Sequence, residues 1–262
     1  MIRYLRLWFS FLKMSWMADL EYRINLIIRV IGEVGWYVAQ LSIFEVLYTH
    51  TKTISGWDVH GMRVFMGSLF LSDLLYMILL MDNMDGIFSF VRKGDLDLYL
   101  VKPVNSQFMI SFRKVATVYF INLVVILGYL TWAIRELPSP VSLWQLFTFA
   151  VMIFFGFISL YSLRFMFATL TVLLQDAGNI HFVWHQLYRL ATRPDPIYPY
   201  FMRVIVFTVF PVAFFASVPS RILVDGFDWH LVVAAPCFAG MLLWVSARFW
   251  HRALKNYSSA SS

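Results

Sequence analysis

Ionisable and polar side chains interrupt the most apolar stretches of the chain, and they are the first candidates for chemistry. The candidates are Arg29, Glu33 and Gln40 on one helical face of the first apolar stretch, Asp73 in the second and Arg164 in the fourth. A charge in hydrocarbon costs at least about 2.5 kcal/mol, so each one needs a partner or water. Two interpretations stay open: a polar wall of a substrate pathway, or interhelical ion pairs that fix the order of the helices. For the second, we expect Arg29 to pair with Glu33, and Asp73 with Arg164 or Arg29.

A histidine pair offers a weaker signal for a metal site. His181 and His185 are four residues apart, so a helix would place both on one face. However, Phe182 stands where a zinc protease of this pattern carries its general-base Glu, and the neighbouring sequence supplies no third ligand. We therefore interpret Ile180–Leu190 as an interfacial segment with His and Trp at the level of the lipid headgroups, and predict no metal site.

Motifs for nucleotide binding and covalent catalysis are missing from the sequence. It contains no Gly-Lys dipeptide, which excludes a Walker A phosphate loop, and no two glycines four residues apart, which excludes G-x-S-x-G and G-x-x-x-G. The single cysteine, Cys237, excludes an internal disulfide framework. We expect no catalytic residue, no metal and no cofactor in this chain.

The composition indicates the environment in which these residues must be positioned. Of 262 residues, 60% are hydrophobic, 19% aromatic and only 14% charged, with a mean hydropathy of +0.70. A soluble domain carries roughly 25% charged residues and could not hide this much apolar surface. The composition excludes a soluble enzyme, a disordered chain and a nucleic-acid module. A net charge of +6 fits basic residues at a cytoplasmic membrane face. We predict an all-α polytopic membrane protein.

Six stretches approach the roughly 20 apolar residues that a membrane-spanning helix needs. They are Ile24–Leu47, Val64–Met81, Val115–Ile134, Leu143–Leu174, Phe201–Val218 and Leu231–Trp250. Together with short loops they use the whole chain, so residues 1–262 are expected to form a single transmembrane domain of six helices.

The basic residues predict the orientation of these spans. With the N-terminus inside, the inner segments carry fifteen of the 21 Lys and Arg residues and the outer segments carry four. This asymmetry places both termini in the cytoplasm. Residues 1–23 carry a polar stripe (Arg3, Arg6, Ser10 and Lys13) on an otherwise apolar helix. We predict a helix in the inner membrane interface, in contact with lipids; the alternative is a cytoplasmic extension of the first span.

The loop at residues 83–106 has the features of a docking element. Met84–Arg92 reads as a short amphipathic helix with Ile87, Phe88 and Val91 on one side, and Gly94 suits its C-cap. Exposed apolar side chains would supply affinity for a partner and the flanking charges its register. The alternative is an ordinary inner loop with basic residues.

Two prolines mark a break near the end of the fifth stretch. Pro211 and Pro219 flank a short apolar run, and each removes a backbone donor. A helix break at membrane depth needs cover from protein or water, so this region is either a built feature of the outer side or a simple kink.

The loop sequence resembles the ABC-2 type permease family, in its branch of small six-span subunits. The family pattern basic-Gly-x-Leu-Asp-x-x-Leu-x-Lys/Arg-Pro is met by Lys93, Gly94, Leu96, Asp97, Leu100, Lys102 and Pro103. Further similar stretches are Ile197-Tyr-Pro199, the run from Phe210 to Pro219, and the tail Leu254-Lys-Asn-Tyr-Ser-Ser259.

This resemblance implies a type V exporter-like fold and a transport role in the inner membrane of a bacterium. Two permease subunits, identical or related, would form a dimer that exports cargo, and two ATPase subunits would bind ATP and Mg on the cytoplasmic side. Short re-entrant helices at residues 211–228 would form an outer gate containing Pro211, Phe214, Phe215 and Pro219. The coupling residues would be Phe88, Arg92, Lys93, Gly94, Asp95, Asp97, Lys102 and Pro103.

Two other functions compete with this interpretation. An ion-coupled secondary transporter would use the in-span carboxylates and often shows an internal repeat, which the sequence lacks. A membrane-embedded lipid-modifying enzyme would need a cluster of His, Asp and Ser at one interface, and none stands out. An ATPase with a phosphate loop that co-purifies with the chain would discriminate between them. The aromatic-rich spans fit an amphiphile, a lipid-linked glycan, a peptide or a drug equally as cargo.

Overall fold

The computed structural model describes residues 2–21, 23–54, 56–174 and 178–255, and these residues fold into helices joined by short connections. Within these ranges five helices are long and apolar enough to cross a membrane. They are α2 (Arg23–His50), α3 (Val59–Tyr76) with its continuation, α7 (Phe120–Arg135), α8 (Leu143–Leu174) and α12 (Trp229–Lys255). Five of the six predicted stretches are thereby confirmed, with ends that differ by a few residues.

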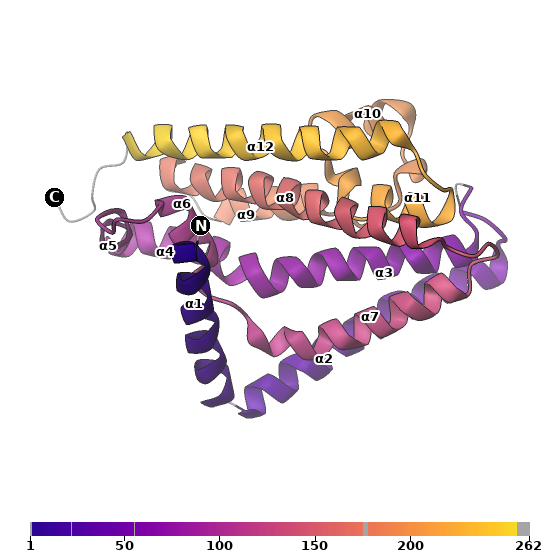
Figure 1. The fold of residues 1–262 in the computed structure, drawn as a ribbon, viewed down its shortest axis with the longest axis horizontal. Helices are drawn as coiled ribbons and strands as arrows, with labels where there is room; N and C mark the ends of the chain where they lie inside the picture. The colour runs from indigo at the N-terminus through magenta and orange to yellow at the C-terminus, as the bar shows by residue number, and fades with distance from the viewer. Residues whose placement is uncertain (1, 22, 55, 175–177, 256–262) are drawn as a thin grey trace.

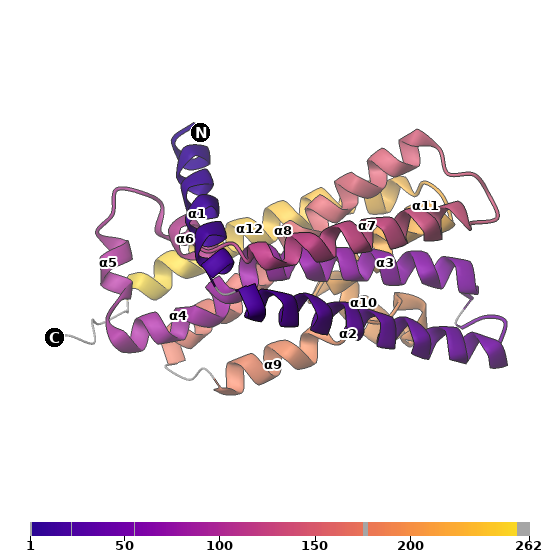
Figure 2. The same cartoon turned by 90° about the horizontal axis from the view of Figure 1, so that it is seen from below.

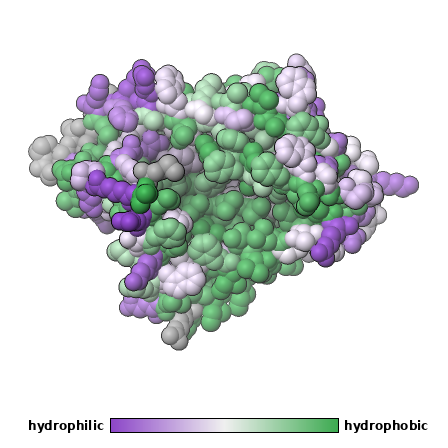
Figure 3. Space-filling view, in the orientation of Figure 1, coloured by the Kyte–Doolittle hydropathy of each residue, from purple (hydrophilic) through white to green (hydrophobic). Residues whose placement is uncertain are grey.

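The long helices run side by side, and the short ones gather at the two ends of the bundle (Figures 1 and 2). We call the end with α4 (Asp82–Lys93), α5 (Leu96–Leu100) and α6 (Ser106–Phe112) the α4 end, and the end with α11 (Ser217–Val224) the α11 end. Figure 3 shows an apolar band across the middle of the molecule, with hydrophilic residues concentrated at both ends. A helical bundle with such a band is an integral membrane protein.

Helix α1 (Ile2–Glu21) lies across the direction of the long helices at the α4 end (Figures 1 and 2). Its contact with the rest of the chain is polar as well as apolar. Ser15 Oγ accepts a hydrogen bond from the Val115 N–H at 3.1 Å, and Asp19 Oδ2 accepts one from the Thr117 N–H at 3.0 Å. The predicted stripe of Arg3, Arg6, Ser10 and Lys13 is exposed. This crosswise direction suits a helix in a membrane surface, which stays a prediction.

The second span continues directly into the helix at the α4 end. A π-helical turn, η1 (Met77–Met81), joins α3 to α4 without a break in the chain direction. The turn leaves carbonyl groups without their usual α-helical donors. The Ala116 N–H donates to the Ile78 carbonyl at 2.9 Å, and the Asn83 amide donates to the Leu79 carbonyl at 3.0 Å. The π turn is therefore held in place by the segment that leads into α7.

The predicted fifth span, Phe201–Val218, is wrong. In its place the chain forms α10 (Tyr200–Thr208), η4 (Val212–Phe214) and the start of α11. Arg203, at the start of the predicted span, and Arg221, just beyond its other end, both bind Asp195, at 2.9 and 2.6 Å. Two arginine side chains that bind the same carboxylate cannot lie on opposite sides of a membrane.

The passage from the α4 end towards the α11 end is made instead by α9 (Gly178–Tyr188) and the residues up to η3 (Asp195–Ile197). The hydroxyl of Tyr188 donates to Asp73 Oδ1 at 2.8 Å, and Asp73 is the middle residue of the span Val59–Ile87. The interfacial interpretation of Ile180–Leu190 is therefore also wrong, because this segment reaches the middle of the bundle.

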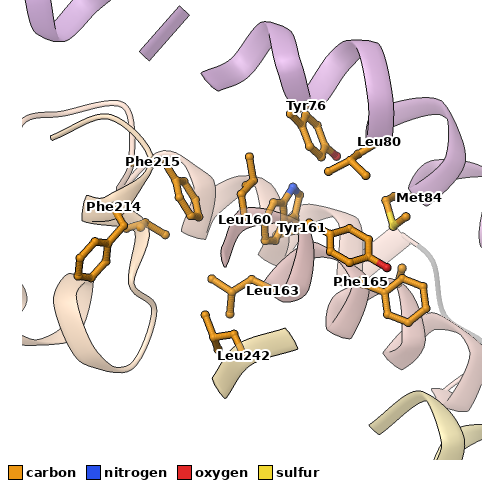
Figure 4. Close-up of a cluster of buried hydrophobic side chains, with 14 of the residues drawn as sticks. Tyr76, Leu80, Met84, Leu160, Tyr161, Leu163, Phe165, Phe214, Phe215 and Leu242 are labelled. Atoms are coloured by element: carbon orange, nitrogen blue, oxygen red, sulfur yellow. The ribbon is translucent and has the colours of Figure 1, made fainter. Parts of the chain in front are cut away.

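The core is centred on α8, which packs against α12 on one side and α3 on the other. Figure 4 shows how side chains of α3 and α4 meet those of α8, with Phe214 and Phe215 reaching the same core from η4 and the residue after it. Gly156 on α8 lets the backbone of η4 come close to the backbone of α8. A Cβ atom there would lie 2.2 Å from the Phe214 carbonyl oxygen.

We expect Gly156→Ala to destabilise the protein by about 1–3 kcal/mol, because the new methyl group forces the η4 backbone away from α8. The measurement is thermal unfolding of the purified chain in detergent. Gly128→Ala on α7 is the matched control, since a Cβ atom there meets nothing within 4 Å. Equal unfolding temperatures for the two variants would contradict the tight approach at Gly156.

Candidate coupling end and transport pathway

The α4 end carries the predicted docking loop, and its first helix ends as expected. Helix α4 stops at Lys93, and Gly94 forms a left-handed C-cap with φ of 75°. The prediction that the apolar face of α4 points outward is wrong, however. Ile87 and Val91 are buried against the core, as is Leu96 at the start of α5. These apolar side chains anchor the loop to the spans and do not face a partner.

The apolar side chains that do face outward at this end belong to α5 and the residue after it. Leu98 is 62% exposed and Val101 is 80% exposed. Lys93, Lys102 and Pro103 are exposed around them, and Gly94, Asp95 and Asp97 are half-buried. The side chains of Phe88 and Arg92, also predicted as coupling residues, lie outside the described part of the chain. We call Lys93, Leu98, Val101, Lys102 and Pro103 the α5 surface.

One arginine holds the short helices of this end together. The Arg113 guanidinium lies 4.0 Å from the centre of the Phe90 ring and donates a hydrogen bond to the Tyr99 hydroxyl at 2.9 Å. Phe90 belongs to α4, Tyr99 to α5, and Arg113 follows α6. A cation between two aromatic rings contributes about 0.5–1 kcal/mol per contact at exposed sites, and more when buried. The α5 surface is therefore presented on a fixed support.

A buried arginine connects this support to the core of the bundle. Arg164 on α8 has an exposed fraction of 0%. Its Nη2 atom lies 2.5 Å from Asp85 Oδ1 on α4, and its Nε donates to the Tyr76 hydroxyl at 3.1 Å. The guanidinium also lies 5.4 Å from the Trp184 ring on α9 and 3.3 Å, through Nη2, from His181 Nδ1. One side chain thus joins α3, α4, α8 and α9.

The predicted ion pairs within the membrane are wrong, because the charged residues have other partners. Asp73 accepts a hydrogen bond from Tyr188, and Arg164 pairs with Asp85. Arg29 and Glu33 form no ion pair among the described residues, and Arg29 instead interacts with the Tyr119 hydroxyl. A polar cavity of about 90 Å³ beside Arg29 is also lined by Asp19, Asn25, Asp82 and Lys114.

A larger cavity, of about 400 Å³, lies between the middle of α2 and α3 and the far end of α9. Two of the predicted pathway residues, Gln40 and Asp73, line it. The same cavity is lined by Arg189 and Arg193, which lie in the turns that follow α9 and which the sequence analysis did not single out. We call this space the α2–α9 cavity.

The α11 end is organised around one buried carboxylate. Asp195 is 1% exposed and binds Arg203, Arg221 and the Ser217 hydroxyl. These contacts tie η3, α10 and α11 into one unit, and the chain between α10 and α11 turns back towards the core at Phe214. The predicted gate residues Pro211, Phe214, Phe215 and Pro219 are all buried in this unit. Sequence reasoning did not single out Asp195, which lies between two prolines in a polar segment.

Comparison with known proteins agrees with this arrangement. The family model described as "ABC-2 family transporter protein" matches residues 34–261, which is nearly the entire chain. No curated protein and no solved structure matches the chain. The match includes the α5 surface, the Arg164 contacts, the α2–α9 cavity and the Asp195 unit, and the bundle has the helices that a membrane component of transport requires. The chain is therefore a member of the ABC-2 transporter family.

Proposed function

We propose that the chain is the permease subunit of an ATP-driven exporter in the cytoplasmic membrane of a bacterium. Two permease subunits form the substrate pathway, and two separate ATPase subunits bind ATP and Mg and dock at the α4 end. The family match carries the proposal, because ABC-2 proteins generally work with ATPase partners. The six-span, type V exporter-like architecture belongs to the same proposal, with α9 and the residues up to η3 as the fifth crossing.

The form of the α4 end supports a mechanical role. An ATPase that closes on the α5 surface would move α4, because Arg113 fixes α5 to α4 through Phe90 and Tyr99. Movement of α4 reaches α8 and α9 through the contacts of Arg164 with Asp85 and Trp184. The coupling path therefore consists of packed, charged and aromatic contacts that have little freedom to absorb the motion.

The charge distribution supports a cytoplasmic α4 end even after the fifth span is corrected. Arg189 and Arg193 now lie within the bundle, and Arg203 belongs to the α11 end. Twelve Lys and Arg residues then remain in segments at the α4 end against five at the α11 end. The positive-inside rule still favours the same orientation, with both termini in the cytoplasm.

This orientation predicts which positions a membrane-impermeant thiol reagent can reach. In a Cys237→Ala background, cysteines at Ser139 and Asp228, near the α11 end, should react in intact cells, whereas a cysteine at Lys102 should react only after the membrane is opened. The reason is the basic-residue asymmetry. Labelling of the Lys102 position in intact cells would overturn the orientation.

The docking proposal is tested by purification from the native membrane. We expect the tagged chain to retain an ATPase with a phosphate loop, and the chain alone to hydrolyse no ATP. Leu98→Asp with Val101→Asp should reduce the retained ATPase by roughly tenfold or more, because truncation of central apolar contacts costs upwards of about 2 kcal/mol at an interface.

The matched control places the same charges at the other end of the bundle. Leu143 is 85% exposed and Phe227 is 50% exposed near the α11 end, so Leu143→Asp with Phe227→Asp should leave the retained ATPase unchanged. If the Leu98→Asp, Val101→Asp variant retained as much ATPase as this control, the ATPase would not dock on the α5 surface.

A further inference from the structure

The α2–α9 cavity lies at the middle of the membrane, as two observations show. Asp73 lines the cavity and is the middle residue of the span Val59–Ile87. Tyr188, which also lines it, holds the Asp73 carboxylate by a hydrogen bond of 2.8 Å. Arg189 directly follows Tyr188, Arg193 also lines the cavity, and both arginine side chains are exposed.

The two arginines have no anionic partner of their own. Among the described residues, neither Arg189 nor Arg193 forms an ion pair, although Arg63, Arg164, Arg203 and Arg221 each do. The carboxylate that lines the same cavity, Asp73, lies beyond ion-pair distance of both and accepts from Tyr188. Glu33 lies two turns earlier on α2 and does not line the cavity. Both arginine side chains are exposed, so their guanidinium groups are accessible to an anion that enters the cavity.

The remaining walls of the cavity are apolar and aromatic. Trp36 is 58% exposed and stands at one side, and the rest of this wall comes from Phe44, Met66, Leu69 and Phe70. Gln40 and Thr192 add neutral hydrogen-bonding groups beside the two arginines. A cavity of about 400 Å³ with mostly apolar walls and a few convergent polar groups is typical of a small-molecule site.

We propose that the α2–α9 cavity binds an anionic amphiphile, whose phosphate, sulfonate or carboxylate group is held by Arg189 and Arg193 while its apolar part lies against Trp36, Phe44 and Phe70. Guanidinium groups bind such oxyanions through paired, charge-assisted hydrogen bonds. The assignment narrows the cargo class of the permease and in this respect rests on the proposed function. Binding of the anion itself depends only on this chain.

The test is equilibrium binding of labelled dodecyl phosphate to the full chain in phosphatidylcholine nanodiscs, without ATPase. We expect saturable binding that Arg189→Gln with Arg193→Gln weakens by roughly tenfold to hundredfold, because the charge-assisted hydrogen bonds to the anion are lost. Arg189→Lys with Arg193→Lys keeps both charges but loses the paired guanidinium geometry, so its affinity should lie between that of the unaltered chain and that of the Gln variant. This second variant separates loss of the anion site from loss of folding.

A second basic cavity on the same chain supplies the matched control. Arg248 and Arg252 are also four residues apart and line a cavity of about 230 Å³ with Trp244 on α12. Arg248→Gln with Arg252→Gln should leave dodecyl phosphate binding unchanged. An equal loss in this control would show that the probe responds to net charge, and would overturn the assignment.

Competitors then define the ligand and its source. Dodecyltrimethylammonium and inorganic phosphate should fail to displace the probe, because the first lacks the anion and the second lacks the apolar part. Displacement by phosphatidylglycerol in the nanodisc would show an anionic membrane lipid in the site, and no displacement would show a site reserved for cargo; both outcomes retain an anionic amphiphile.

Three further results would overturn the proposal. They are unchanged binding in the Arg189 and Arg193 Gln variant, equal displacement by the cationic probe, and a Gln variant that dissociates a permease dimer while it still binds the probe. The last would assign the arginines to a subunit interface. If the unaltered chain bound no probe but still retained the ATPase, only the cargo assignment would be removed, whereas loss of ATPase capture with probe binding intact would remove only the exporter proposal.

Discussion

Asp85→Asn is expected to destabilise the chain by about 3 kcal/mol and to separate ATP hydrolysis from transport. The change leaves the fully buried Arg164 guanidinium without its carboxylate, and breaking a buried pair by removing one partner costs about 3–5 kcal/mol. We place the effect at the lower end because the Asp85 side chain is 45% exposed. Thermal unfolding measures the first effect. Cargo-stimulated ATPase activity of the assembled complex measures the second, and should be lost while the ATPase stays bound.

The neighbouring ion pair of the same helix is the control for this experiment. Asp82 binds Lys114 at 2.6 Å, but the two side chains are 25% and 54% exposed. Exposed pairs contribute about 0–1 kcal/mol, so Asp82→Asn should change unfolding little. Arg164→Met combined with Asp85→Asn should recover part of the stability of Asp85→Asn, since no unpaired buried charge remains. If Asp85→Asn keeps full cargo stimulation, the link between α4 and α8 is structural only.

Asp195→Ala is expected to release the unit at the α11 end, with a loss of about 3 kcal/mol or more in stability. The substitution removes the carboxylate shared by Arg203, Arg221 and Ser217 and leaves two like charges side by side. For a chain of this length such a loss lowers the unfolding temperature by roughly 6–12 °C. Proteolysis should then cut between α10 and α11 first, because these short helices have few other polar ties.

A partly exposed ion pair at the same end provides the comparison. Glu45 binds Arg63 at 2.6 Å, and the two side chains are 45% and 21% exposed. Glu45→Gln should lower the unfolding temperature by much less than Asp195→Ala. If both variants lowered the unfolding temperature by the same amount, the buried Asp195 contacts would stabilise the protein no more than an exposed ion pair does.

The helices of this chain were predictable where one local pattern determines them. Leu143–Leu174 was predicted with the ends that α8 has, because an apolar run of this length, with Arg164 as its single charged residue, is stable in a membrane only as a helix. The end of α4 at Gly94 was predicted from the need for a residue with positive φ at a helix C-cap. Both depend on neighbours within a few residues.

The prediction of the fifth span was wrong because hydropathy does not account for polar groups that satisfy each other. Phe201–Val218 is the more apolar run, yet Arg203 within it is tied to Asp195 and Pro211 ends its helical course. The segment that returns from the α4 end towards the α11 end contains His181, Tyr188 and Arg189, which look interfacial when taken alone. Their place in the bundle follows from Asp73 and Arg164, partners that lie far away in the sequence.

The short helices at residues 83–106 were predictable in their location but not in the direction of their apolar faces. The loop motif placed a partner surface at residues 83–106, whereas Ile87 and Val91 turned out to face the core. An amphipathic helix carries no information about which of two apolar environments its face meets, the protein interior or a partner. The π turn at Met77–Met81 contributes to this choice, and periodicity counted at 3.6 residues per turn does not anticipate it.

Because of the π turn, the number of residues between α3 and α4 cannot change without rotating α4 relative to α3. The turn adds one residue to a helix that would otherwise be regular, and one residue corresponds to about 100° of rotation. A chain shortened by one residue between Tyr76 and Asn83 would therefore keep its apolar composition and its span but turn Asp85 away from Arg164. We therefore expect apolar substitutions within Met77–Met81 to be tolerated, whereas a deletion there would disconnect the α4 end from α8 without altering a single contact residue.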